Sequence, residues 1–97
     1  MFNFTKQSSE TYAIIVDFID VLATAETIPI NGKSVIAYLG TVDKTTDVIT
    51  SSTISGKTII IIVKAGVDRN SYKITVKITT SLLNVFEEDI LMEIHDI

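Results

Sequence analysis

Apolar and polar residues alternate along much of the chain, a period-two pattern typical of strands with one buried face. The clearest example is residues 72–79, whose apolar face consists of Tyr72, Ile74, Val76 and Ile78. Lysine and threonine occupy the opposite face of the same segment. Residues 59–63 are an uninterrupted run of isoleucine and valine, which indicates a buried strand. Both patterns favour an all-β fold, because β-branched side chains pack well on a pleated surface.

The strand pattern recurs along the chain between short clusters of turn residues. About seven short strands are expected, at residues 12–16, 26–30, 34–39, 48–54, 58–63, 72–79 and 85–94. Their spacing predicts an immunoglobulin-like β-sandwich that occupies residues 12–97 as a single domain, with a small barrel as the alternative. Tyr72 begins its strand directly after a turn, which is where such sandwiches carry a tyrosine corner.

One segment breaks the alternation directly after the first expected strand. In residues 17–23, Phe18, Val21 and Leu22 follow helical spacing, and Asp17 can cap the N–H groups of a short turn. The sequence therefore predicts one short helical turn here.

Two hairpins are predicted from turn chemistry. Asn31-Gly32 lies between two apolar runs and is a strong hairpin signal, which requires positive φ at both residues. Pro29 has no N–H, so the strand that contains it is expected at a sheet edge. Ser55-Gly56 separates the next two runs, and Gly56 supplies the positive φ of the second hairpin.

The last expected strand, residues 85–94, has a conflict in its phase. Its inward residues are Ile90, Met92 and Ile94. Asp89 and Glu93 then point outward, where they can face the lysines of residues 72–79. Strict alternation would also point Glu88 inward, so we expect a β-bulge near Glu87-Glu88 that resets the phase.

The first eleven residues differ from the rest of the chain. Residues 1–11 are polar and irregular and are expected to form a flexible N-terminal arm. They lack a positively charged start followed by an apolar stretch, so no secretory signal is expected. We therefore expect synthesis in the cytoplasm.

Composition and charge exclude several classes of function. The 97 residues carry a net charge of −4, and an acidic surface repels nucleic-acid phosphates. The absence of cysteine excludes disulfides, thiol catalysis and cysteine metal sites. The longest apolar run is much shorter than the roughly 20 residues of a membrane span. No nucleic-acid or membrane partner is expected.

Few side chains offer catalytic or metal-binding chemistry. His95 is the only histidine and lies near the end of the chain, where a strand-end role is the simpler interpretation. Asp17 and Asp20 are explained by capping rather than by acid–base catalysis. Asp43 and Asp47 flank a polar loop whose spacing fits turn stabilisation better than a calcium site. We expect no enzyme activity, no cofactor and no bound metal.

Candidate partner contacts lie in the C-terminal part of the chain. Ser81-Leu82-Leu83-Asn84 places two apolar side chains at a hairpin tip, where an adjacent subunit can bind them. Glu87 and Glu88 belong to an acidic run that is either a solvated face or a docking patch for a basic partner. The candidate contact residues are therefore Leu82, Leu83, Glu87 and Glu88.

Several segments in their order along the chain resemble a known family. These segments are Tyr12…Val16-Asp17-Phe18-Ile19-Asp20-Val21-Leu22, Glu26-Thr27-Ile28, Val48-Ile49-Thr50-Ser51-Ser52-Thr53-Ile54-Ser55-Gly56, Val63 through Gly66, Tyr72-Lys73-Ile74-Thr75 and Glu88-Asp89-Ile90-Leu91-Met92-Glu93-Ile94. Across residues 10–97 the chain resembles small phage structural proteins of the fibre–tail adaptor family. One departure is the turn after Thr80, which lacks the glycine usual in that family.

The resemblance implies a function that the residues alone do not provide. It implies a non-enzymatic structural protein of a phage or prophage virion, in the tail or head–tail region, with an immunoglobulin-like fold. Its partners would be other virion proteins, with a homo-oligomer in the particle as an option, and it would be assembled in the host cytoplasm. The alternative is an adhesive or ligand-binding immunoglobulin-like module of a bacterial surface protein.

Overall fold

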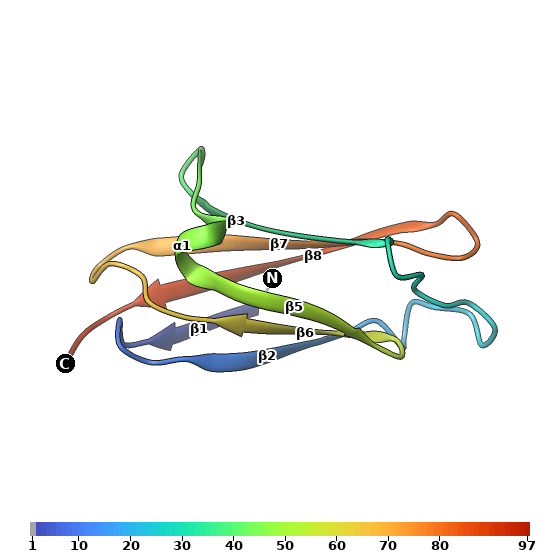
Figure 1. Cartoon of the computed structure of the whole chain (residues 1–97), viewed down its shortest axis with the longest axis horizontal. Coiled ribbons are helices and arrows are strands. Elements are labelled where there is room, and N and C mark those ends of the chain that lie inside the picture. The colour runs from blue at the N-terminus through green and yellow to red at the C-terminus, as the bar shows by residue number, and fades with distance from the viewer. Residues whose placement is uncertain (1) are drawn as a thin grey trace.

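Two facing β-sheets make up the computed structural model, which describes residues 2–97; Met1 lies outside the described residues. The larger sheet contains, in spatial order, β1 (Phe2–Lys6), β8 (Val85–Ile94), β7 (Ser71–Thr79), β3 (Lys33–Leu39) and β4 (Val42–Asp43). The smaller sheet contains β2 (Tyr12–Asp17), β6 (Thr58–Val63) and β5 (Ile49–Ser55). A single-turn helix, α1 (Thr45–Val48), joins β4 to β5 (Figure 1). The expected all-β sandwich is therefore confirmed.

The strand order is that of an immunoglobulin-like sandwich. The strands β2, β6 and β5 occupy the places of strands B, E and D, while β3, β7 and β8 occupy those of C, F and G. The tyrosine corner is also present, because the backbone N–H of Val67 donates to the hydroxyl of Tyr72 at 3.1 Å. The first strand is an exception: β1 runs parallel to β8 in the larger sheet and not beside β2.

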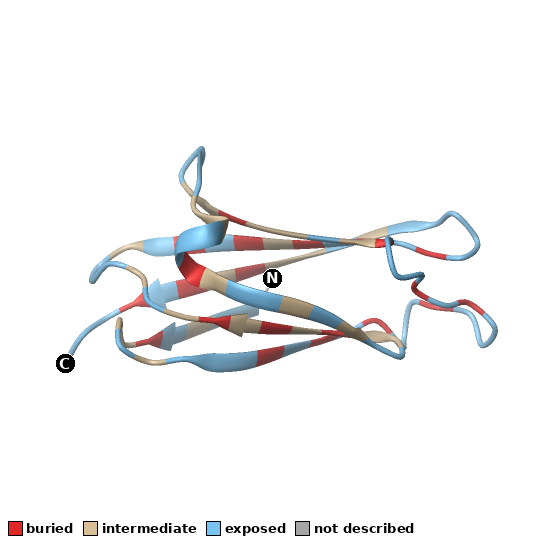
Figure 2. Cartoon of the chain, viewed as in Figure 1, coloured by how far each residue is buried: buried red, intermediate tan, exposed pale blue. Residues whose placement is uncertain are grey.

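The hydrophobic core lies between the two sheets, and buried residues alternate with more exposed ones along the strands (Figure 2). Along β7 the burial alternates as the sequence predicts, and along β6 every second residue is buried. The core residues are Ile14, Val16, Phe18, Leu22, Ile28, Ala37, Val48, Ile59, Ile61, Val63, Tyr72, Ile74, Val76, Ile78, Ile90, Met92 and Ile94.

The predicted pattern holds for six of the seven expected strands. The β5–β6 hairpin turns at Gly56, whose φ is +61°, as expected from the sequence. Ile90, Met92 and Ile94 are buried on β8, as predicted. On the outer face, Lys73 Nζ lies 3.5 Å from a carboxylate oxygen of Asp89.

The flexible arm expected over residues 1–11 is wrong for residues 2–6, which form β1. This strand pairs in register with β8 and buries Lys6, which is 2% exposed. The ammonium group of Lys6 donates to the backbone carbonyls of Gln7 at 2.8 Å, Glu10 at 2.9 Å and Ala65. These three acceptors offset the cost of burying the charge, so an apparently polar segment docks as a strand.

The first predicted hairpin is also wrong, because residues 26–30 do not form a strand. A turn is present, with the N–H of Gly32 donating to the carbonyl of Pro29 at 2.8 Å, but neither Asn31 nor Gly32 has positive φ. Glycine is needed here for space, since a Cβ on Gly32 would collide with the carbonyl oxygen of Thr79. Pro29 therefore lies in a connection and not on an edge strand.

The turn predicted after β2 is present but does not continue into a helix. The N–H groups of Val21 and Leu22 both donate to the carbonyl of Phe18, at 3.1 and 3.2 Å. Asp17 caps the turn, because its carboxylate accepts the N–H of Ile19 at 2.9 Å. The helix α1 forms instead within and just after the polar loop that the sequence predicts at residues 43–47.

No bulge interrupts β8 opposite β7, so the expected bulge near Glu87-Glu88 is wrong. The register is continuous from Val85 opposite Thr79 to Glu93 opposite Ser71. Glu88 therefore keeps its place in the alternation and lies on the inner face of its sheet.

Candidate interaction surfaces

The loop between β7 and β8, residues 80–84, carries the two predicted apolar contacts. Leu82 is 60% exposed and Leu83 is 82% exposed. The loop is closed by the N–H of Thr80, which donates to the carbonyl of Asn84 at 2.8 Å. Leu83 has φ of +65°, a conformation that favours glycine and costs a leucine about 1–2 kcal/mol. The structure thus holds an apolar side chain in solvent on a strained backbone.

The buried carboxylate of Glu26 holds this loop through hydrogen bonds. Glu26, which is 2% exposed, accepts hydrogen bonds from the hydroxyl of Thr80, from the side-chain amide of Asn84 at 2.9 Å and from the N–H of Ala23 at 2.9 Å. These donors, that of Thr80 foremost, lower the pKa of Glu26 below its ordinary value. Sequence analysis missed Glu26; its only local sign is a lone acid before an apolar run.

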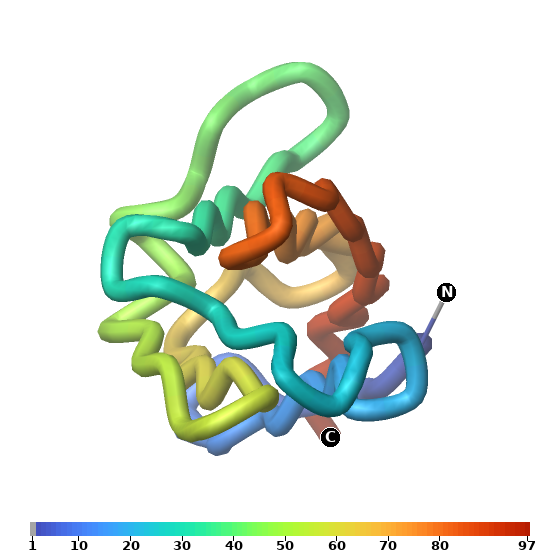
Figure 3. Tube along the Cα trace, turned by 90° about the vertical axis from the view of Figure 1, so that its right-hand side faces the viewer, coloured from blue at the N-terminus to red at the C-terminus, as the bar shows by residue number. Residues whose placement is uncertain are grey.

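A second set of hydrogen bonds joins the loop of residues 80–84 to the connection between β2 and β3. The N–H of Ser81 donates to the carbonyl of Thr27 at 2.9 Å, and the N–H of Thr27 donates to the hydroxyl of Ser81 at 3.0 Å. Both loops lie at one end of the elongated molecule, the end that faces the viewer in Figure 3. The exposed large apolar residues of these two loops are Ile19, Val21, Ile30, Leu82 and Leu83.

The acidic run after this loop does not form one patch. Glu87 is exposed on the outer face of β8, and Asp89 on the same face accepts the hydroxyl of Thr75 at 3.0 Å. Glu88 points to the inner face, opposite Val76. Of the four predicted contacts, Leu82 and Leu83 lie together, whereas Glu87 and Glu88 lie on opposite faces.

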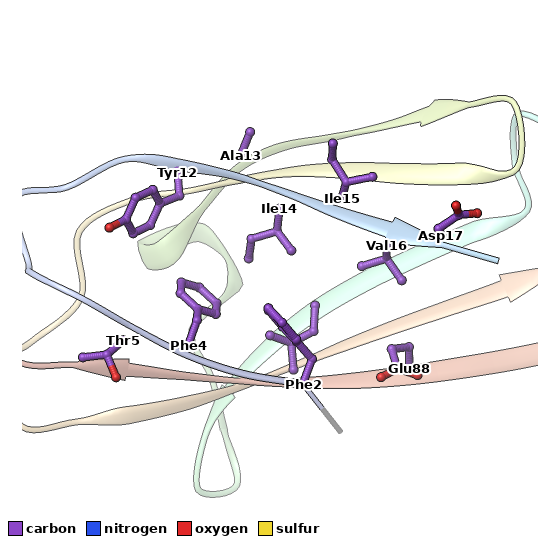
Figure 4. Close-up of a pocket in the computed structure, with 11 residues that line it drawn as sticks. Phe2, Phe4, Thr5, Tyr12, Ala13, Ile14, Ile15, Val16, Asp17 and Glu88 are labelled. Carbon is purple, nitrogen blue, oxygen red and sulfur yellow. The ribbon is translucent and has the colours of Figure 1, made fainter. Parts of the chain in front are cut away.

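Glu88 belongs to a groove of about 630 Å³ that opens between β1 and β2 (Figure 4). In this view Phe2 and Phe4 point from β1 toward β2, and Ile14 and Val16 point back toward them. Phe4 packs edge-on against Tyr12, with ring centroids 6.1 Å apart. The described residues that line it are Phe2, Phe4, Thr5, Tyr12, Ala13, Ile14, Ile15, Val16, Asp17, Glu88 and Ile90. Sequence analysis missed this groove.

Two of the remaining chemical candidates, Asp43 and Asp47, have polar partners nearby. The carboxylate of Asp43 accepts the N–H of Thr45 at 2.9 Å and its hydroxyl at 2.6 Å, which stabilises the turn as predicted and lowers the pKa of Asp43. Asp47 lies 3.6 Å from the amine of Lys44, and His95 is exposed beyond β8. Within residues 2–97, no group of three His, Cys, Asp or Glu side chains could hold a metal ion. The same residues contain no helix of a length and apolarity that would cross a membrane.

These features define a small immunoglobulin-like sandwich whose surface offers an apolar loop, a groove and strand edges. Residues 6–93 match the family described as "Podophage GP4 fiber-tail adaptor protein gp77", and the chain belongs to this family. No curated protein matches the chain. The family match confirms the resemblance seen in the sequence and identifies a phage structural protein of the tail–fibre adaptor type, which is part of the virion and binds other virion proteins.

Proposed function

We propose that this chain joins tail and fibre components of a podophage through protein–protein contacts alone, without catalysis, and that the loop of residues 80–84 is one contact surface. In this role the protein assembles in the host cytoplasm, as an oligomer where the particle requires it. It takes no nucleic acid or membrane as partner, in keeping with its net charge of −4.

The observation that carries the loop assignment is that an apolar, exposed loop is rigidly held. The hydrogen bonds from Thr80 and Asn84 to Glu26 hold the loop that keeps Leu82 and Leu83 in solvent before any partner arrives. A loop fixed in this way loses little conformational entropy on binding. Immunoglobulin-like variable domains bind through the equivalent loop between strands F and G, an analogy at the level of the fold.

The acidic candidates have different parts in this proposal. Glu87 lies on the outer face a few residues beyond the loop and extends the contact surface with a charge at its rim. Rim charges chiefly affect association rate and partner choice. Glu88 lies in the groove and would contact only a partner that reaches between the sheets.

The test is to replace Leu82 and Leu83 with serine in the full chain and to count copies of the chain in purified particles by mass spectrometry. The two leucines, once buried in a contact, contribute together about 3 kcal/mol or more, so incorporation should fall roughly a hundredfold. The matched control is V42S/V67S, which removes two exposed apolar side chains outside this loop.

Both double variants should melt like the wild type, because all four side chains are more than half exposed. Undiminished incorporation of L82S/L83S would place the contact elsewhere, and an equal loss in the control would show that the effect is not specific to the loop.

A further inference from the structure

The outer edge of β2 presents unpaired backbone groups. The N–H of Phe18 donates to the carbonyl of Lys57 at 3.0 Å, in the same register that pairs β2 with β6. Hydrogen-bonded positions alternate along an antiparallel pair, so the N–H and C=O groups of Ala13, Ile15 and Asp17 point away from β6. Among the described strands, β2 pairs only with β6. Three residues therefore offer a regular row of donors and acceptors.

This edge is the place that strand A fills in an immunoglobulin constant-type sheet. Here β1 pairs with β8 in the opposite sheet, so five strands face three. No described strand other than β6 pairs with β2, and Phe2 on the inner face of β1 is more than half exposed. The groove is thus the space that one additional strand beside β2 would cover.

The edge also lacks the usual protection against pairing. Natural edge strands carry lysine, proline or a bulge that discourages addition of another strand. The sequence of β2 contains none of these, and its register with β6 is regular. Ile15 on its outer face is 66% exposed. Such an edge favours addition of a strand from another chain.

The charge of the groove favours one kind of occupant. Asp17 at the C-terminal end of β2 is among its lining residues, and the described residues of the lining include no lysine or arginine. A second copy pairing through its own β2 would bring another Asp17 and no basic residue to this site. A strand with a basic residue beside Asp17 complements the site instead.

We propose that the edge of β2 and the adjoining groove bind an extended segment of another virion protein, which pairs antiparallel with β2. Its inward side chains are apolar and cover Phe2, Phe4 and Ile14. A lysine or arginine near its N-terminal end lies beside Asp17, because antiparallel pairing places that end at the C-terminus of β2. This site is separate from the loop of residues 80–84 and does not depend on the role proposed for that loop.

The probe is an N-acetylated peptide of about eight residues, long enough to span β2, that alternates valine and threonine after an N-terminal lysine. It is titrated into the full-length, isotopically labelled protein and followed by amide NMR shifts. Shifts should appear in β1 and β2 and not in residues 80–84. A peptide methylated at alternate backbone nitrogens should lose binding at least tenfold, because it cannot pair with the edge.

The charge preference has its own matched pair of variants. Exchange of the peptide lysine for glutamate should weaken binding to the wild type roughly tenfold. Asp17→Asn keeps an oxygen for the turn cap and should remove most of that preference, whereas Glu87→Gln, an equal charge change on the outer face of β8, should preserve it. Equal effects of the two variants would overturn the charge assignment.

Two further outcomes would overturn the proposal. One is the absence of shifts in β2 at millimolar peptide while the protein remains folded. The other is self-association of the wild type that Ile15→Lys abolishes, because a second copy would then occupy the edge.

Discussion

Replacing Lys6 with methionine tests whether β1 is a docked strand. Methionine keeps an apolar stem of similar length but removes the ammonium group, so the carbonyls of Gln7, Glu10 and Ala65 lose their donor. Hydrogen bonds from a charged group contribute about 1.5–3 kcal/mol each when buried. Two of these acceptors are local and partly exposed, so water replaces part of the loss. Burial also lowers the pKa of Lys6, because desolvation disfavours the charged form of the amine.

These opposing contributions leave a net destabilisation of about 1–2 kcal/mol for K6M. For a domain of this size that corresponds to a fall in melting temperature of roughly 5–15 °C. The assay is thermal and urea unfolding, together with hydrogen exchange of the β1 amides, which should exchange faster than in the wild type.

The control is Lys77→Met, which removes a lysine from the exposed outer face of β7 and should change stability by less than about 0.5 kcal/mol. If K6M and K77M melt at the same temperature and β1 keeps its protection, the three carbonyl contacts do not hold the strand and the reasoning fails.

Two further predictions concern the end of the molecule that carries the apolar loop. Gly32→Ala should cost about 1–3 kcal/mol in urea unfolding, because its Cβ would meet the carbonyl oxygen of Thr79; a change below about 0.5 kcal/mol would contradict that steric argument. The pKa of Glu26 is lower in the folded state, so its ionised form contributes stability above the unfolded-state pKa, and that contribution disappears as pH falls through the folded-state pKa. Glu26→Gln should therefore lower the urea midpoint at pH 7 and flatten its acid dependence below about pH 4.5; parallel pH profiles for the two proteins would refute this.

Elements whose causes are local could be predicted from the sequence. The β5–β6 hairpin depends on Gly56, whose positive φ needs no distant partner. The alternation in β7 likewise records which residues face the core. By contrast, Phe2, Phe4 and Lys6 share one face of β1, but a lysine in that pattern does not predict a buried position. Lys6 can be buried because the carbonyl of Ala65 accepts a hydrogen bond from its amine. That contact is a property of the folded chain.

In the apolar loop, too, one feature has a local cause and another depends on residues distant in the sequence. The exposure of Leu82 and Leu83 could be predicted because they stand between two strands in a short polar turn. Its support could not, since Glu26 binds Thr80 and Asn84, which are distant in the sequence. The hairpin predicted at Asn31-Gly32 is wrong for a similar reason. Gly32 is required because a Cβ there would meet the carbonyl oxygen of Thr79, and not because its own φ is positive.

The inward position of Glu88 connects the groove to the unusual course of the first strand. An acid on the inner face of a sealed sandwich is costly, and this is why the sequence predicts a bulge beside it. The structure keeps the register and leaves the groove open at that point. The groove opens where β1 joins the larger sheet, and among the described strands only β6 pairs with β2. The inward acid and the open edge of β2 are then two parts of one arrangement, because the groove that Glu88 lines is the same space that a strand beside β2 would cover.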